Sequence, residues 1–225
     1  MSMDRIDFPF RDRTEAGRVL AQDLREYADR DDVMVLALPR GGVPVGFEVA
    51  RALHVPLDVF VVRKLGVPGH QELAMGAIAS GGVLVTEPQV IADLGIPAAV
   101  LLDVAEREEQ ERLRREREYR GDRPAPEVRG RTIILVDDGL ATGSTMRAAV
   151  AALRKLQPAR VVVAVPVGAP STCAELTAEA DEVFCTRAPE PFHAVGEWFI
   201  EFSQTSDEEV RDLLWLAERK IAHHT

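Results

Sequence analysis

Residues 133–145 read IILVDDGLATGST, and this segment combines features that are seldom found together. The four apolar residues at 133–136 run without polar interruption, which is typical of a central strand buried on both faces in a parallel sheet. Asp137 and Asp138 follow at the point where the apolar run stops. A turn of small residues then leads into a helical pattern of apolar side chains. The segment therefore predicts a strand, two acids, a tight turn and a helix in succession.

The small residues at 142–145, here called the small-residue turn, indicate an anion site. The first backbone N–H groups of a helix have no intrahelical acceptor, and the helix dipole favours negative charge there. Carboxylates directly upstream would repel a phosphate, so Asp137 and Asp138 are better suited to accept hydrogen bonds from sugar hydroxyls. A ribose 5-phosphate satisfies both ends of the segment. Either half alone would describe an ordinary strand end or a capped helix.

Together, the two halves resemble the motif by which type I phosphoribosyltransferases bind 5-phosphoribosyl 1-pyrophosphate (PRPP). In that motif four apolar residues, two acids, a short variable stretch and Thr-Gly-x-Thr follow one another, and this segment matches at every position. A Walker A loop is excluded because Gly143 is followed by Ser144 instead of lysine. The resemblance implies that PRPP is bound by Asp137, Asp138, Gly139, Leu140, Ala141, Thr142, Gly143, Ser144 and Thr145.

A second candidate site is the PRGG sequence at 39–42, here called the glycine turn, which follows the apolar run at 33–38. Paired glycines expose backbone donors, and Arg40 supplies a cation able to bind an anion through two nitrogens. Taken alone, the pattern equally describes a tight turn with an exposed arginine. The resemblance implies that Arg40, Gly41 and Gly42 hold the pyrophosphate of PRPP, in a loop that often contains a strained peptide bond.

The apolar run at 56–62 predicts a further strand that ends at Arg63 and Lys64, and a glycine-punctuated stretch and a predicted hairpin follow. This arrangement predicts a flexible lid over residues 63–86, here called the lid segment, with the two cations at its base. The alternative is a surface hairpin whose cations are solvated. The resemblance implies that the lid excludes water from a reactive sugar, with Arg63, Lys64, Asp137 and Asp138 as catalytic residues.

Strand and helix patterns alternate along the chain, which predicts an α/β fold with an open, mostly parallel twisted sheet flanked by helices. We expect a single phosphoribosyltransferase-like domain over residues 1–225, with the lid and a small hood as additions. Ligands bind at the carboxyl ends of strands in such sheets, so Arg40, Arg63 and Asp137 should converge on one cleft. Residues 98–120 are dense in Glu and Arg of nearly cancelling charge, and we interpret them as a solvated helix.

Residues 187–205, here called the hood segment, are rich in aromatic side chains for a chain with only 5% of them. Phe192 and Trp198 are candidates to stack on a planar acceptor of the transfer reaction. The alternative, that these aromatics simply cap the core, is equally consistent with the sequence.

Composition limits the partners and the compartment. The net charge of −10 argues against nucleic-acid and anionic-membrane binding, and no apolar run approaches the length of about 18 residues that a membrane helix needs. The first 13 residues contain no apolar signal segment. Cys173 and Cys185 lack metal-site spacing, and we expect two buried thiols in a reducing compartment. These features predict a cytoplasmic protein.

The resemblance also implies a reaction. The segments FRDR (10–13), LPRGGVPVG (38–46) and AVGEWF (194–199) are similar to a bacterial branch of the family. The expected enzyme is a glycosyltransferase of the pentosyltransferase class, acting in nucleotide metabolism, that moves ribose 5-phosphate from PRPP to an unidentified base or related nitrogen nucleophile and releases pyrophosphate. Mg²⁺ is implied by the polyphosphate, with no protein metal cage. A non-catalytic PRPP or nucleotide sensor is the alternative. The sequence does not define the oligomeric state, and a homodimer is considered because it is the commonest symmetric assembly.

Overall fold

The computed structural model describes residues 8–121 and 123–221 and contains a five-stranded parallel sheet and a three-stranded antiparallel sheet. The parallel sheet has the order β2-β1-β6-β7-β8, with β6 in the centre. The predicted α/β fold with a mostly parallel sheet and a central strand at 133–136 is therefore confirmed. Its strands are β1 (Val33–Ala37), β2 (Leu57–Val59), β6 (Thr132–Val136), β7 (Arg160–Val167) and β8 (Glu182–Arg187).

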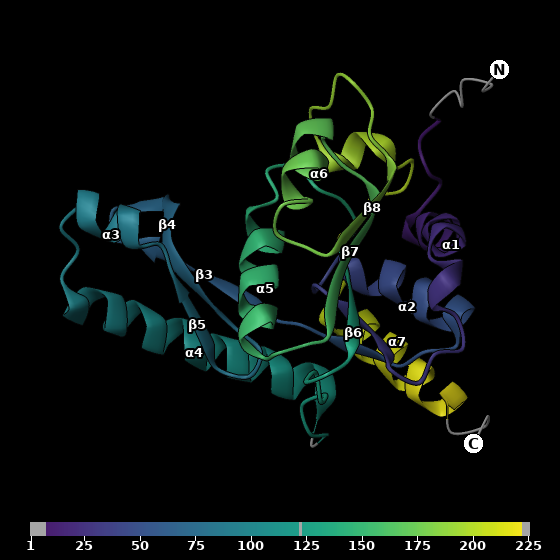
Figure 1. Cartoon of the computed structure of the whole chain (residues 1–225), viewed down its shortest axis with the longest axis horizontal. Helices are drawn as coiled ribbons and strands as arrows, with labels where there is room; N and C mark the ends of the chain where they lie inside the picture. The colour runs from purple at the N-terminus through teal and green to yellow at the C-terminus, as the bar shows by residue number, and fades with distance from the viewer. Residues whose placement is uncertain (1–7, 122, 222–225) are drawn as a thin grey trace.

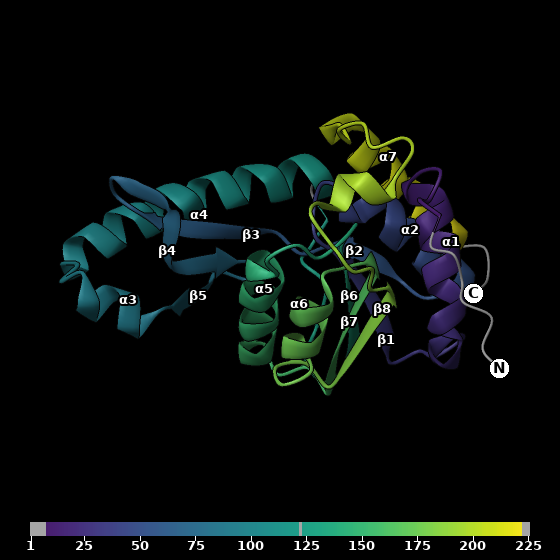
Figure 2. The same ribbon diagram turned by 90° about the horizontal axis from the view of Figure 1, so that it is seen from above.

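Helices cover both faces of the parallel sheet, and the view from above separates the two layers (Figures 1 and 2). Because neither face meets water, its central strands are continuous apolar runs. One face packs against α1 (Arg13–Asp23), α2 (Gly42–Leu53) and α7 (Asp207–Ile221), and the other packs against α5 (Ser144–Lys155) and α6 (Pro170–Leu176).

Alternate residues of β6 enter different hydrophobic cores. Ile134 and Val136 belong to the core beneath α2 and α7, whereas Ile133 and Leu135 belong to the core beneath α5. All four side chains are fully buried. The strand is thus fixed from both sides, and the acids that follow it start from a rigid position.

A second unit, here called the lobe, projects from the parallel sheet on the left of Figure 1. It has a small core of its own that includes Leu65, Met75 and Val104. The predicted lid segment forms most of its antiparallel sheet, and the long helix α4 runs along that sheet. The lobe consists of β3 (Val62–Val67), β4 (His70–Ala79), β5 (Val83–Thr86), α3 (Pro88–Asp93) and α4 (Ala98–Arg120).

The prediction of one strand over residues 56–62 is wrong, because this run serves both sheets in turn. Phe60 still donates its amide to Ala37 of the parallel sheet at 2.9 Å. Val61 instead donates to the hydroxyl of Ser80 and accepts from the Ser80 amide, both at 2.9 Å, at the base of the lobe. The sequence of residues 56–62 does not indicate that the chain passes from one sheet to the other after Phe60. Arg63 therefore lies inside β3 and does not follow a strand of the parallel sheet.

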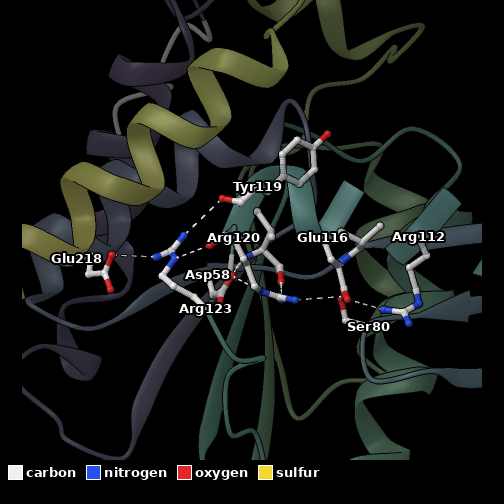
Figure 3. A network of polar contacts seen from close by, with 10 residues as sticks. Asp58, Ser80, Arg112, Glu116, Tyr119, Arg120, Arg123 and Glu218 are labelled. Atoms are coloured by element: carbon white, nitrogen blue, oxygen red, sulfur yellow. Dashed lines mark hydrogen bonds and ion pairs between the residues drawn. The ribbon is translucent and has the colours of Figure 1, made fainter. Parts of the chain in front are cut away.

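The interpretation of residues 98–120 as a solvated helix is also wrong at its C-terminal half, where α4 buries charged side chains (Figure 3). Arg120, whose side chain is 3% exposed, donates to Asp58 Oδ1 at 2.8 Å and to the Val59 carbonyl at 2.6 Å. Glu116 pairs with Arg120 at 3.3 Å and accepts a hydrogen bond from Ser80. These contacts join the lobe to the edge of the parallel sheet.

The prediction of two buried free thiols is wrong, because Cys173 of α6 and Cys185 of β8 form a disulfide. They are 12 residues apart in the chain, and α6 packs back against β8 so that the two side chains meet. Sequence spacing alone does not reveal this approach. Among the residues that the structure describes, no helix is both long and apolar enough to cross a membrane.

Candidate active site

The glycine turn and the paired acids lie far apart in the chain but against each other in the fold. β1 pairs with β6 in parallel, and the Leu38 amide donates to the Val136 carbonyl at 2.8 Å, so the two strands end together. A Cβ on Gly41 would overlap the carboxylate of Asp138, and one on Gly42 would lie 2.7 Å from the Val136 carbonyl oxygen. Only glycine permits this approach. The two motifs therefore form one site.

Arg40 lies in the middle of the glycine turn, after a cis peptide bond with Pro39. Its guanidinium is 4.0 Å from the carboxylate of Asp207, the first residue of α7. The Tyr119 hydroxyl donates to the same carboxylate at 2.7 Å, and burial, followed by this hydrogen bond, raises the pKa of Tyr119. The cation that the sequence predicts for pyrophosphate is thus held between the turn and the C-terminal helix.

Asp137 and Asp138 are mostly buried at the end of β6. Burial, and then the neighbouring charge of Asp138, raises the pKa of Asp137 well above its ordinary value. Burial also raises the pKa of Asp138, although the cation of Arg13 opposes that shift. Two adjacent carboxyl groups with raised pKa values make an unfavourable contribution to stability. Titratable groups with strongly shifted pKa values are concentrated at functional sites.

Arg13 is a site residue that the sequence reasoning did not identify. Its Nε donates to Asp138 Oδ2 at 2.9 Å, and its Nη2 lies 2.9 Å from the same oxygen. The FRDR sequence at 10–13 was the available signal, but nothing in that short stretch indicates a partner 125 residues later.

Residues 139–141 are tied down by the neighbouring strand and helix. Leu140 donates its amide to Val167 and accepts from Ala169, both at 2.9 Å, and the Thr172 hydroxyl donates to the Ala141 carbonyl at 2.7 Å. The Leu140 amide is therefore occupied and is not available to a phosphate.

The small-residue turn ends where α5 begins. Gly143 has a positive φ of 70°, which an L side chain rarely adopts, and a Cβ there would lie 2.6 Å from Thr172 Cγ2. The first hydrogen bond of α5 runs from the Arg147 amide to the Gly143 carbonyl at 2.9 Å. The amides of residues 144–146 precede it and have no acceptor within the helix. This end of α5 has the geometry of an anion site.

Arg63 and Lys64 are neighbours on β3 and point in different directions, as successive strand residues do. The Lys64 ammonium donates to the Ser144 hydroxyl at 2.6 Å, beside the start of α5. Arg63 instead pairs with Glu108 of α4 at 2.8 Å. The structure therefore brings Lys64 to the small-residue turn and leaves Arg63 within the lobe.

The hood segment covers the other side of residues 139–141. It contains the short 3₁₀ helix η2 (Val195–Trp198), and a Cβ on Gly139 would collide with the Val195 side chain. Phe192 and Trp198 both pack against a small core built around Phe10. This packing agrees with the capping alternative. The indole Nε1 of Trp198 is buried and has no hydrogen-bond partner in the part of the chain that the structure describes.

Within residues 8–121 and 123–221, no group of three or more His, Cys, Asp or Glu side chains could hold a metal ion. Asp137 and Asp138 are the carboxylates of the site, and Arg13 already pairs with one of them. Mg²⁺ commonly uses one or two carboxylates together with substrate phosphates and water. The donor set therefore fits a magnesium ion carried mainly by a polyphosphate.

In a comparison with known proteins, residues 12–198 match the model of the phosphoribosyl transferase domain. The chain belongs to the phosphoribosyl transferase family. Membership of this family, which the resemblance implied, is confirmed.

Two Mycobacterium tuberculosis proteins, from strains H37Rv and CDC 1551, are each 46% identical to this family member over 213 residues. Both are named "putative phosphoribosyl transferase". The alignment covers 95% of this chain and 48% of each relative, so the chain spans about half the length of these proteins. The crystal structure of TT1426 from Thermus thermophilus is 42% identical, with a TM-score of 0.82 over 92% of this chain and 98% of that one.

Proposed function

We propose that this protein transfers the ribose 5-phosphate of PRPP to a nitrogen nucleophile with release of pyrophosphate. The observation that carries the proposal is the close approach of Gly41 to the Asp138 carboxylate. This approach brings the two candidate binding motifs together at the carboxyl ends of β1 and β6. A ligand with an anionic group at each end and a polyol between them matches this arrangement. PRPP has that composition.

Each part of the site has a role in the proposed reaction. The start of α5, with Thr142, Ser144 and Thr145, would anchor the 5-phosphate, so that remote binding energy orients the reacting carbon. Asp137 and Asp138 would accept hydrogen bonds from the ribose hydroxyls. These contacts restrict the sugar before the bond to pyrophosphate breaks.

Negative charge gathers on the departing pyrophosphate while the ribose becomes oxocarbenium-like. Arg40 and the amides of Gly41 and Gly42 would stabilise that charge, and one such donor is worth about 2.7–4 kcal/mol of transition-state stabilisation. Lys64, which contacts Ser144, would instead help to hold the 5-phosphate from the lobe. Mg²⁺ bound to the polyphosphate, with Asp137 or Asp138 as a protein ligand, would neutralise further charge.

The hood segment is the proposed acceptor side, because η2 lies directly over Gly139. Phe192 and Trp198 would contribute apolar surface on which a planar acceptor could stack. Purines, pyrimidines, pyridine carboxylates and other amines are all candidate acceptors.

Titration calorimetry of the purified protein with PRPP and Mg²⁺, followed by pyrophosphate release against a panel of bases, tests the proposal. Binding with base-dependent release is expected. Asp138→Asn should abolish release in a protein that still unfolds cooperatively. Binding without release for every base would favour the PRPP sensor, and absence of binding would overturn both functions.

A further inference from the structure

Arg13 is the first residue of α1 and is held rigidly where the helix begins. Asp12 caps the helix by accepting a hydrogen bond from the Glu15 amide at 2.7 Å. The side chain of Arg13 is only 12% exposed and reaches across to the acids at the end of β6. An arginine so buried needs a carboxylate partner, and its position relative to that partner is fixed.

The ion pair with Asp138 is one-sided. Nε and Nη2 of Arg13 both approach Oδ2 at 2.9 Å, and Oδ1 takes no part in the ion pair. The guanidinium therefore fixes the direction of the carboxylate while its second oxygen stays outside the pair. A sugar hydroxyl approaching Oδ1 would not compete with Arg13.

The far side of the guanidinium contacts the chain just before α7. Nη1 of Arg13 donates to the Ser203 carbonyl at 2.6 Å, and its central carbon lies 4.0 Å from the centre of the Phe202 ring. Phe202 in turn stacks on Phe199 at 5.0 Å. The guanidinium of Arg13 is thus held on three sides. Asp138 binds Nε and Nη2, the Ser203 carbonyl binds Nη1, and the Phe202 ring packs against the planar face.

We propose that Arg13 is a positioning residue that orients Asp138 toward the ribose hydroxyls, and that Phe202 and Ser203 hold Arg13 in place. This role rests on the proposed function, since it assumes that Asp138 binds the sugar. Loss of the guanidinium would leave a mostly buried carboxylate without its counter-charge. The carboxylate would then lose the contact that fixes its direction.

The affinities for three ligands distinguish a positioning role of Arg13 from a general structural role. The proposed sugar site binds PRPP and ribose 5-phosphate, whereas inorganic pyrophosphate without Mg²⁺ uses the glycine turn. In calorimetry with Mg²⁺, Arg13→Gln should weaken PRPP and ribose 5-phosphate by about tenfold, which is the loss of one charge-assisted hydrogen bond. Pyrophosphate is titrated without Mg²⁺, so that no metal ion joins it to Asp137 or Asp138, and its affinity should stay unchanged. Arg13→Lys should restore most of the lost affinity, because it returns the positive charge.

The matched control is Arg18→Gln, which removes another arginine of α1 that pairs with a buried carboxylate, Glu48, away from the site. It should bind all three ligands as the unaltered protein does. Phe202→Leu removes the stacking partner and should show a smaller loss with the same selectivity.

Equal weakening of all three ligands in Arg13→Gln, or unchanged binding of PRPP, would overturn the positioning role and leave the proposed function intact. Loss of pyrophosphate affinity without loss of ribose 5-phosphate affinity would also contradict it. If the unaltered protein binds neither PRPP nor ribose 5-phosphate, the proposed function itself fails, and the role of Arg13 in it fails as well.

Discussion

Lys64 and Ser144 are 80 residues apart in the chain, yet the ammonium of Lys64 donates a hydrogen bond to the Ser144 hydroxyl at 2.6 Å. The contact connects the lobe to the start of α5, where the first amides have no acceptor within the helix. A cation beside such amides favours an anion more than either does alone. The lobe is therefore placed to act on whatever anion binds there.

Lys64→Ala should lower pyrophosphate release by about 10²-fold, because a charged donor at the proposed 5-phosphate site, which orients the reacting carbon, is lost. Arg63→Ala should leave kcat and KM nearly unchanged and cost at most about 1 kcal/mol of stability, since its ion pair with Glu108 is partly exposed. Steady-state kinetics of both variants provide the measurement. A larger kinetic loss in Arg63→Ala than in Lys64→Ala would contradict the assignment.

Gly41→Ala should abolish PRPP binding, because the new methyl group would occupy the space of the Asp138 carboxylate. The control is Gly69→Ala at the lobe tip, where φ is 83° and no atom lies within 4 Å of the added Cβ. That variant should lose about 1–2 kcal/mol of stability through backbone strain and keep PRPP affinity. Normal calorimetric binding by Gly41→Ala would show that the two motifs do not form a joint site.

Asp137→Asn should become more stable, relative to the unaltered protein, as the pH rises from about 4 to 8. Burial, and then the charge of Asp138, raises the pKa of Asp137 well above 3.8. Above about pH 4 the unfolded carboxyl loses its proton while the folded one keeps it, so stability falls with pH. The amide has no such proton to lose, and its oxygen can still accept from the Asp138 amide.

Thermal unfolding of both proteins across this pH range checks the prediction for Asp137. The difference in Tm should grow with pH, and Asp137→Asn should at the same time lose pyrophosphate release. A difference that is constant or shrinks with pH would mean that the carboxyl ionises freely in the folded protein.

Arg120→Met should lower the free energy of unfolding by about 3–5 kcal/mol, because Asp58 would keep a buried charge without its partner and Glu116 would retain only its pairing with Arg112. The control is Arg114→Met on the same helix, whose side chain is 57% exposed and pairs with Glu111 and Glu118. That change should cost under about 1 kcal/mol. Urea denaturation measures both, and equal losses would argue against a buried network.

The Cys173–Cys185 disulfide should contribute about 2–3 kcal/mol by restricting the unfolded chain, as expected for a short bridged loop. Reductant should lower the Tm of the unaltered protein toward that of a Cys173→Ala/Cys185→Ala double variant. The double variant should not respond to reductant. An unaltered protein whose Tm is equally insensitive would show that the thiols are free in solution.

The parallel sheet and the meeting of its two motifs were predictable because their signals are local. A buried parallel strand is an uninterrupted apolar run, and Asp137 and Arg40 each follow such a run directly. The carboxyl ends of parallel strands lie on the same side of a sheet. Residues that directly follow neighbouring strands can therefore be predicted to lie close together. No detail of side-chain packing was needed.

Features that depend on contacts between distant residues were not predictable. The switch of the chain between sheets after Phe60 depends on Ser80, and it leads Arg63 and Lys64 into β3, where successive side chains point in different directions. Arg13 pairs across 125 residues, and the cysteines meet only when α6 folds back on β8. In each case the local sequence is compatible with several partners, and tertiary packing selects one.

The buried charges that join α4 to the parallel sheet also restrict how the sequence can change. Loss of Arg120 alone leaves Asp58 uncompensated, whereas replacing a whole buried ion network with apolar residues of similar volume is often neutral. Asp58, Glu116 and Arg120 should therefore vary as a group among related proteins, retained together or replaced together. An evolutionary intermediate that keeps only one of them would be less stable than either the complete network or its apolar replacement.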